Sequence, residues 1–115
     1  MAAPIVFFDI AGPNDQTLVD FYASVFDWDI GSDNQFSVTP RSEIRGAIRK
    51  DPTEKRIYIG VPDVSDCLSR IVAAGGTIDA PRFEVQGVVV LGLFRDPAGN
   101  PMGLVELDGE HLRIP

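Results

Sequence analysis

One stretch of the sequence indicates the fold most clearly: RIYIGVPDVSDCLSRIVAAGG, residues 56–76. It contains the signals of a strand, a helix start and a helix end in one run. The β-branched and aromatic residues of RIYIGV are typical of a strand, and PDVSD is typical of a helix entry. AGG, at 74–76, ends the helix. The helix carries one apolar stripe at helical spacing: Val64, Leu68, Ile71 and Val72.

The first half of the chain has the same order. IVFFDI (5–10) is strand-like, and GPND after it supplies Asn14 or Asp15 as a helix cap. Phe8 and Ile57 lie 49 positions apart (57 − 8), whereas the helical Leu18 and Leu68 lie 50 apart (68 − 18), so we expect one residue inserted in a loop. A period near 50 predicts two copies of one supersecondary unit. The stripe of the first helix is Leu18, Phe21, Tyr22, Val25 and Phe26.

Three short strand-like runs follow each helix. Those of the first half are WDI (28–30), FSV (36–38) and IRGAIR (44–49), separated by turn residues in GSDNQ and TPRSE (39–43). Those of the second half lie near 77–85, 88–94 and 102–107, with DPAGN as the turn before the last. We therefore expect a single α+β domain over 1–115, built from two βαβββ modules at about 4–50 and 55–110, whose sheets curl around a shared cavity.

Composition narrows the function classes. The net charge of −7 argues against binding to nucleic-acid phosphates or to an anionic membrane surface. The single cysteine, Cys67, excludes an internal disulfide and is expected to be an inert, buried thiol. The start MAAPIVFFDIAG lacks the basic region of a signal peptide, and we expect a cytoplasmic location. The only histidine, His111, is expected in an exposed tail.

Three segments together resemble the glyoxalase, bleomycin-resistance and extradiol-dioxygenase superfamily, also called vicinal oxygen chelate proteins. They are FYASVFDW (21–28), VPDVSDCLSRIVAAGG (61–76) and DPAGNPMGLVE (96–106). The resemblance spans nearly the whole chain and implies the paired βαβββ architecture and a homodimer. Members include lyases, dioxygenases, epimerases and metal-free drug-binding proteins, so the fold does not choose the chemistry.

The resemblance also implies where a metal would bind, on the first and last strands of each unit. At those positions the chain has Phe7, then Ala47 or Arg49, then Arg56, and finally Glu106. A phenyl ring cannot bind a metal and a guanidinium repels one, so only Glu106 is a competent ligand. Because catalytic metals keep about three protein ligands, we expect no metal and no cofactor. Instead, Glu106 is predicted to pair with Arg56 across neighbouring strands.

The same positions predict a cavity lining. Asp9 shares a strand face with Phe7 by alternation. It is either a carboxylate that orients a ligand or acts as a base, or an ordinary solvated or salt-bridged side chain near a strand end. Aromatic surface there suits a flat or cationic organic molecule. The full predicted lining is Phe7, Asp9, Trp28, Phe36, Arg56, Tyr58 and Glu106.

Two functions remain open. One is a metal-free protein that holds a small organic molecule in a cavity shared by two subunits, as the resemblance to bleomycin-resistance members implies. The other is a lyase, isomerase or dioxygenase-type enzyme that rebuilds a metal site from Asp9 and Glu106 or works by acid–base chemistry alone. Equilibrium binding without turnover distinguishes the first from the second.

Overall fold

The structure is a computed structural model that describes residues 2–38 and 44–115. These residues form strands β1 to β8 and helices α1 and α2 and confirm the predicted α+β class. They divide into two compact units: Val6–Arg56, and Ile57–Pro115 with the N-terminal residues as far as Ile5. The turn predicted at TPRSE (39–43) lies outside the described residues. Neither α1 nor α2 is long and apolar enough to cross a lipid bilayer.

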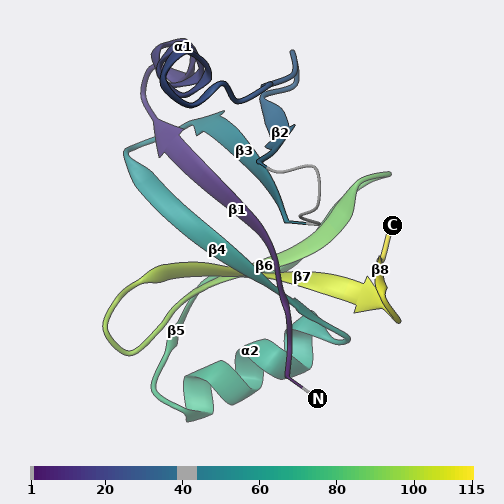
Figure 1. The fold of residues 1–115 in the computed structure, drawn as a ribbon. Helices are drawn as coiled ribbons and strands as arrows, with labels where there is room; N and C mark the ends of the chain where they lie inside the picture. The colour runs from purple at the N-terminus through teal and green to yellow at the C-terminus, as the bar shows by residue number, and fades with distance from the viewer. Residues whose placement is uncertain (1, 39–43) are drawn as a thin grey trace. The chain divides into compact units, whose positions relative to one another are not determined.

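The first unit is a small sheet of order β2–β3–β1 with one helix (Figure 1). In this sheet β1 runs parallel to β3, and β2 is antiparallel to β3. The α1 helix begins where Asn14 caps it, accepting a hydrogen bond from the Thr17 backbone N–H at 3.2 Å. This contact selects Asn14 over Asp15 as the cap. The elements are β1 (Ile5–Gly12), α1 (Asp15–Phe26), β2 (Gln35–Ser37) and β3 (Arg45–Lys50).

The segment after α1 is not the strand predicted at WDI (28–30). Asp27 ends the helix in a left-handed conformation, with φ of 57°, and turns the chain. Trp28 then stacks on Tyr22, with ring centroids 5.1 Å apart, and on Phe36 at 4.8 Å. Ring stacking against the helix, instead of strand pairing, holds this segment. Within the described residues the first unit is therefore strand, helix, strand, strand.

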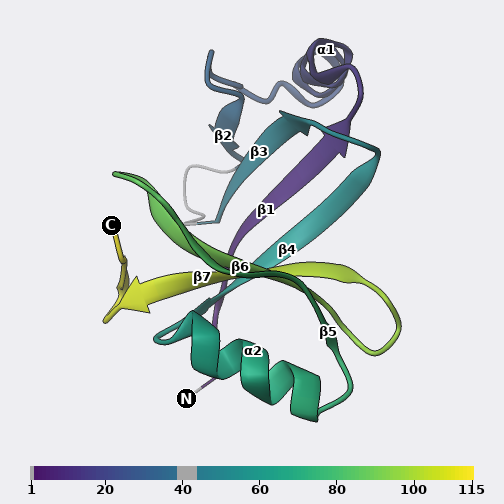
Figure 2. The ribbon, with the colours of Figure 1, turned by 180° about the vertical axis from the view of Figure 1, so that it is seen from behind.

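The second unit has the complete βαβββ order. Its sheet has the order β4–β7–β6–β5, with β4 parallel to β7, and β8 pairs with the end of β7 beside the C-terminus (Figure 2). The three strands predicted after the helix are confirmed. His111 is exposed as predicted, and it begins the short strand β8. The elements are β4 (Glu54–Val61), α2 (Val64–Ala73), β5 (Thr77–Val85), β6 (Val89–Arg95), β7 (Pro101–Asp108) and β8 (His111–Leu112).

The core of the second unit lies between α2 and one face of this sheet. Gly92 of β6 makes the close packing possible, since an added Cβ would lie 2.6 Å from Val64 Cγ1 and 3.1 Å from Leu68 Cδ1. The predicted stripe stops before Val72, which is 51% exposed. The buried core consists of Val61, Val64, Leu68, Phe94 and Leu104.

The two units repeat with one spacing. Strands β1 and β4 begin 49 positions apart (54 − 5), and the helix caps Asn14 and Asp63 are also 49 apart (63 − 14). The residue predicted to be inserted between strand and helix is therefore not present. DPAGN forms the predicted turn, in which Asp96 accepts hydrogen bonds from the backbone N–H groups of Ala98 and Asn100 at 3.0 and 2.9 Å.

Candidate functional site

Alternation along β1 places the predicted site residues of the first unit on two different faces. An added Cβ at Gly12 would lie 2.9 Å from Leu18 of α1, so the even-numbered residues of β1 face the helix. Phe8 is one of them, and its ring meets Phe36 edge-on at 5.7 Å. Phe7 and Asp9 point to the opposite face. We call it the open face of the first unit because α1 does not cover it.

Trp28 and Phe36 therefore do not line a surface with Phe7, and the predicted lining is wrong in this respect. Phe36 is 2% exposed and stacks on Trp28, which stacks in turn on α1. Both rings belong to the packing between the helix and the sheet. Aromatic residues in or beside strands most often belong to the core, as these two do.

Among residues 2–38 and 44–115, an ion-pair network on the open face includes five charged side chains. Asp9 is 4% exposed, and its Oδ2 lies 3.1 Å from Nε of Arg49. Arg49 also donates from Nη1 to Asp51 Oδ2 at 2.8 Å and from Nη2 to Glu54. Glu54 accepts a further hydrogen bond from Arg56 Nη2 at 3.1 Å, and Arg56 is 5% exposed. Arg49 thus lies between three carboxylates.

The ionisation of this network follows from its contacts. Burial alone would lower the pKa of Arg49, but hydrogen bonds to Glu54 and Asp51 and the charge of Asp9 raise it overall. Burial would likewise raise the pKa of Glu54, but the hydrogen bond from Arg49 and the charge of Arg56 lower it overall. The ion-pair partners of Arg49 and Glu54 therefore favour the charged forms of both side chains.

The donor set does not fit a divalent metal ion. On the open face of the paired strands β1 and β3, Asp9 lies opposite Ala47, Phe7 opposite Arg45, and Ala11 opposite Arg49. One carboxylate among two guanidiniums is a poor metal site, and the carboxylate already neutralises Arg49. No group of three or more His, Cys, Asp or Glu side chains suited to a metal occurs among the described residues.

Glu106 lies on the helix side of the second unit, away from any open face. Its Oε1 accepts a hydrogen bond from the backbone N–H of Val64, the first residue of α2, at 3.0 Å. Tyr58 lies on the other face of this sheet, because an added Cβ at Gly103 of β7 would lie 2.4 Å from its ring. Odd and even residues of β7 face opposite ways, so Glu106 and Tyr58 cannot line one surface.

The predicted pair between Glu106 and Arg56 is also wrong. The first and last strands of the unit are neighbours as expected, but their register sets Glu106 opposite Val61, five residues beyond Arg56 on β4. The partners of Glu106 are Arg82 of β5, at 3.2 and 2.9 Å, and Arg113, at 3.3 Å.

These contacts determine the charge of Glu106. The hydrogen bond from Arg82 lowers the pKa of this carboxyl, against the effect of burial, and the Val64 N–H assists. Both carboxylate oxygens are engaged, which leaves no basis for a metal site rebuilt from Glu106 and Asp9. Glu106 instead joins α2, β5 and the C-terminal residues to β7.

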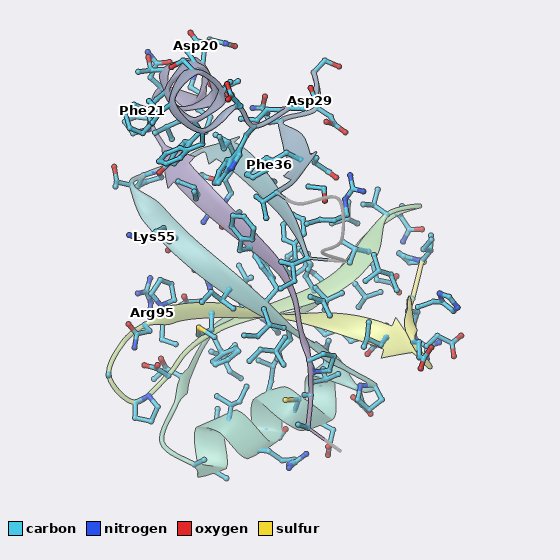
Figure 3. The ribbon with its side chains drawn as sticks, viewed as in Figure 1. Asp20, Phe21, Asp29, Phe36, Lys55 and Arg95 are labelled. Atoms are coloured by element: carbon cyan, nitrogen blue, oxygen red, sulfur yellow. The ribbon has the colours of Figure 1, made fainter. Side chains whose placement is uncertain are left out.

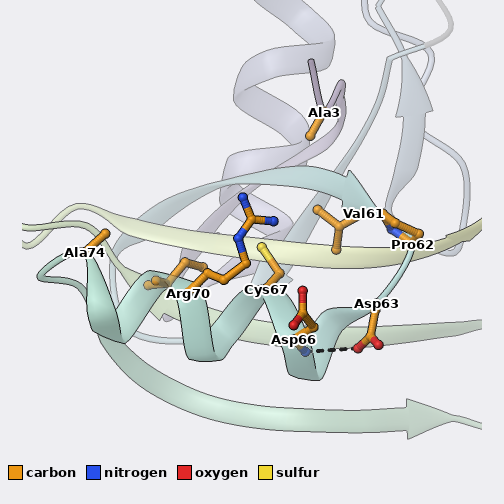
Figure 4. A pocket seen from close by; sticks show the side chains of 9 residues that line it. Ala3, Val61, Pro62, Asp63, Asp66, Cys67, Arg70 and Ala74 are labelled. Atoms are coloured by element: carbon orange, nitrogen blue, oxygen red, sulfur yellow. Dashed lines mark hydrogen bonds between the residues drawn. The ribbon is translucent and has the colours of Figure 1, made fainter. Parts of the chain in front are cut away.

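A shallow groove of about 590 Å³ lies beside α2, on the outside of the second unit (Figure 4). Cys67 and Arg70 point into it from the helix, and Asp63 and Asp66 lie at one end. Burial raises the pKa of the Cys67 thiol, but Cys67 is only partly buried and lines the groove, so the prediction of a buried cysteine is wrong. This groove shares no residue with the ion-pair network.

In the sequence, Arg49 was recognised only as a residue that cannot bind a metal at a family metal position. Asp51 and Glu54 were not among the predicted site residues. The signal was present in RKDPTEKR, 49–56, where charges of both signs surround the turn between β3 and β4. The short turn between these strands brings those charges together. Arg82 and Arg113 have no comparable local signal, because their contacts to Glu106 depend on the tertiary fold.

The fold and site define a class: α+β proteins made of two strand–helix–strand units, each with its first and last strands paired in parallel. The model of one family, the glyoxalase-like domain, matches residues 5–105. The chain belongs to this glyoxalase-like family, as its sequence resemblance to the superfamily predicted.

Solved structures with the same fold are distant in sequence. A hypothetical protein from Bacillus halodurans C-125 is 10% identical, with a TM-score of 0.67 over 98% of this chain and 100% of that chain. Methylmalonyl-CoA epimerase from Mycobacterium tuberculosis is 14% identical, with a TM-score of 0.59 over 90% of this chain and 87% of that one.

A Streptomyces coelicolor methylmalonyl-CoA epimerase variant, in complex with 2-nitronate-propionyl-CoA, is 15% identical, with a TM-score of 0.62 over 92% and 98% of the two chains. Identities this low show the fold alone. No curated protein matches the chain.

Proposed function

We propose that this chain binds a flat or cationic small organic molecule without a metal ion, in a cavity shared by two copies of the chain. The supporting observation is the position of Arg49 between three carboxylates on the open face of the first unit. The resemblance to metal-dependent members implies that the strands corresponding to β1 and β3 supply metal ligands. Here those strands supply Asp9 and Arg49, so a guanidinium of the protein neutralises the buried carboxylate.

The surroundings of the network favour a ligand that is neutral or positively charged. Arg49 contacts three carboxylates, and the chain as a whole has a net charge of −7. Phe7 shares the open face with Asp9, and its ring offers apolar area to a planar molecule. Tyr58, the other ring of the predicted lining, belongs to the second unit, where it lies against Gly103 of β7. A desolvated cation–π contact contributes about 2 kcal/mol.

The shared cavity requires a homodimer, and the second unit has a surface suited to one. Apolar side chains at the β5–β6 turn and the C-terminus are exposed, and the two segments adjoin where Gly87 N–H donates to Pro115 O at 3.0 Å. A patch of this kind is typical of a surface that another chain covers. Its exposed residues are Val85, Val88, Leu112 and Ile114.

A ligand screen tests the proposal. We expect planar aromatic cations to raise the melting temperature, and anions of the same shape to leave it unchanged. Phe7→Ala should then weaken binding at least tenfold, about 1.4 kcal/mol. Phe83→Ala, which removes a 38% exposed ring from β5, is the matched control and should leave affinity unchanged. Equal losses in both variants, or anions that bind as well as cations, would contradict the proposal.

A second function, an acid–base isomerase, is favoured by one observation. Asp9 is a buried carboxylate on the same face as Phe7, a position from which a base could reach a bound molecule. Structural neighbours include epimerases solved with CoA esters. Incubation with methylmalonyl-CoA in D₂O would reveal exchange of its acidic C–H, and Asp9→Asn should abolish it. Binding of the screened cations without any such exchange supports the binding protein.

A further inference from the structure

Helix α1 presents an apolar side that the described residues do not cover. Although its sequence DQTLVDFYASVF is rich in apolar residues, α1 has no buried residue, whereas the shorter α2 buries Val64 and Leu68. Phe21 is 52% exposed, Val25 56% and Phe26 54%. Phe21 and Val25 are four residues apart and so form one ridge along the helix. We call these three side chains the α1 ridge.

The ridge is held rigidly by the aromatic packing behind it. Phe36 is buried and stacks on Trp28, which stacks on Tyr22 with their ring planes 10° apart. Tyr22 in turn contacts Phe21, with centroids 5.1 Å apart, and Phe26 at 6.0 Å. Rings fixed in this way lose little side-chain entropy when another surface covers them.

Acidic residues adjoin the ridge in sequence and follow the helix. Asp20 precedes Phe21, Asp27 follows Phe26, and Asp29 lies beyond the helix end (Figure 3). The hydrogen bonds to Asp15, Asp20 and Asp33 come from neutral donors, namely Asn34, Gln16 and the Gln35 backbone. Residues 1–40 contain no lysine, arginine or histidine. No aspartate of this group pairs with a cation among the described residues: Asp15, Asp20, Asp27, Asp29 and Asp33.

We propose that the α1 ridge docks a positively charged amphipathic helix of another protein. A ridge formed by residues four apart fits the groove of a second helix, and the aspartates beside it match lysine or arginine at the edge of that helix. A ridge-to-ridge contact between two copies of this chain would bring like charges together. The inference does not depend on the ligand proposed for the open face.

A synthetic helix of leucine and lysine is a suitable probe for the intact chain. We expect the probe to shift the amide resonances of Phe21, Val25 and Phe26, and its affinity to fall about tenfold between about 50 and about 300 mM salt. Val25→Ala should weaken binding about fivefold, and Phe21→Ala more. Val72→Ala on α2, where the valine is 51% exposed, is the matched control and should have no effect.

Charge and apolar contact are separated by a second variant. Asp20→Asn with Asp27→Asn should weaken binding and flatten the salt dependence without unfolding the chain, because asparagine tolerates the left-handed conformation of Asp27. Equal weakening by Val72→Ala, shifts that map away from α1, or an unchanged salt dependence would overturn the proposal. A dimer of the chain alone that Phe21→Ala dissociates would assign the ridge to self-association and would also overturn it.

Discussion

Replacing Glu106 with glutamine should destabilise the second unit in a pH-dependent way. The glutamate side chain is 7% exposed and receives hydrogen bonds or ion pairs from Val64 N–H, Arg82 and Arg113. Glutamine has nearly the same shape, so the substitution removes the charge and leaves the packing in place. The result therefore reports on the electrostatic contribution of Glu106.

The magnitude follows from the exposure of the partners. A hydrogen bond to a charged group contributes about 1.5–3 kcal/mol, and removing one member of a fully buried pair costs about 3–5 kcal/mol. Arg82 and Arg113 are 33% and 45% exposed, so water solvates them after the change and the loss is smaller. We expect Glu106→Gln to lose about 2 kcal/mol at neutral pH, or roughly 10 °C in melting temperature.

The pH dependence has a definite sign. Because the hydrogen bond from Arg82 lowers the pKa of Glu106 in the fold, its stabilisation is complete above the pKa of the unfolded chain. It is lost as the pH falls through the lower pKa of the folded state. Urea unfolding curves of the wild type and Glu106→Gln should therefore converge on acidification.

A double-mutant cycle checks the partner assignment. The effects of Arg82→Met and Glu106→Gln should be coupled, whereas those of Arg56→Met and Glu106→Gln should add within about 0.5 kcal/mol. Coupling between the Arg56 and Glu106 substitutions would instead show that these two side chains interact, which the strand register excludes. If Glu106→Gln had the same urea midpoint as the wild type at neutral pH, the charge of Glu106 would not stabilise the fold. A stability difference between the two that stayed the same in acid would contradict the proposed pH dependence.

Three further predictions concern the network, the packing and the assembly. Arg49→Met should cost about 3–5 kcal/mol in urea unfolding, because Asp9 stays buried, and Arg49→Lys should recover only part of it; full stability of Arg49→Met would contradict the role of the network. Gly103→Ala should cost about 1–3 kcal/mol by displacing the buried Tyr58 ring, and a melting temperature equal to wild type would show that the ring has room. Sedimentation at micromolar concentration should give twice 12.5 kDa, and a mass of 12.5 kDa would exclude the shared cavity.

Local signals in the sequence were sufficient for most of the fold. The caps Asn14 and Asp63, the glycines after α2 and the alternating runs of the second half determine where elements begin and end. The strand predicted at WDI is absent. Tryptophan and isoleucine favour strands, but the turn at Asp27 and the stacking of Trp28 depend on the helix beside them.

The site was harder to predict, because one residue of register decides the face. Glu106 follows Leu104 by two positions and so shares its helix side, an alternation that was visible in the sequence. The resemblance to metal-dependent superfamily members suggested instead that Glu106 occupies the position of a metal ligand. Its pairing with Arg82, 24 residues away, and the convergence of Asp9 with Arg49, 40 residues away (49 − 9), arise only from tertiary packing.

The most direct test of the central claim is thermal unfolding of the unmodified chain with zinc, nickel, manganese or magnesium and then with a chelator. A metal that bound the folded chain at a hundred times its dissociation constant would add about 2.7 kcal/mol, a shift that is easily measured. We expect an unchanged melting temperature, because Arg49 already neutralises Asp9 on the strands where metal-dependent relatives place ligands. A rise with one of these metals, reversed by the chelator, would contradict it.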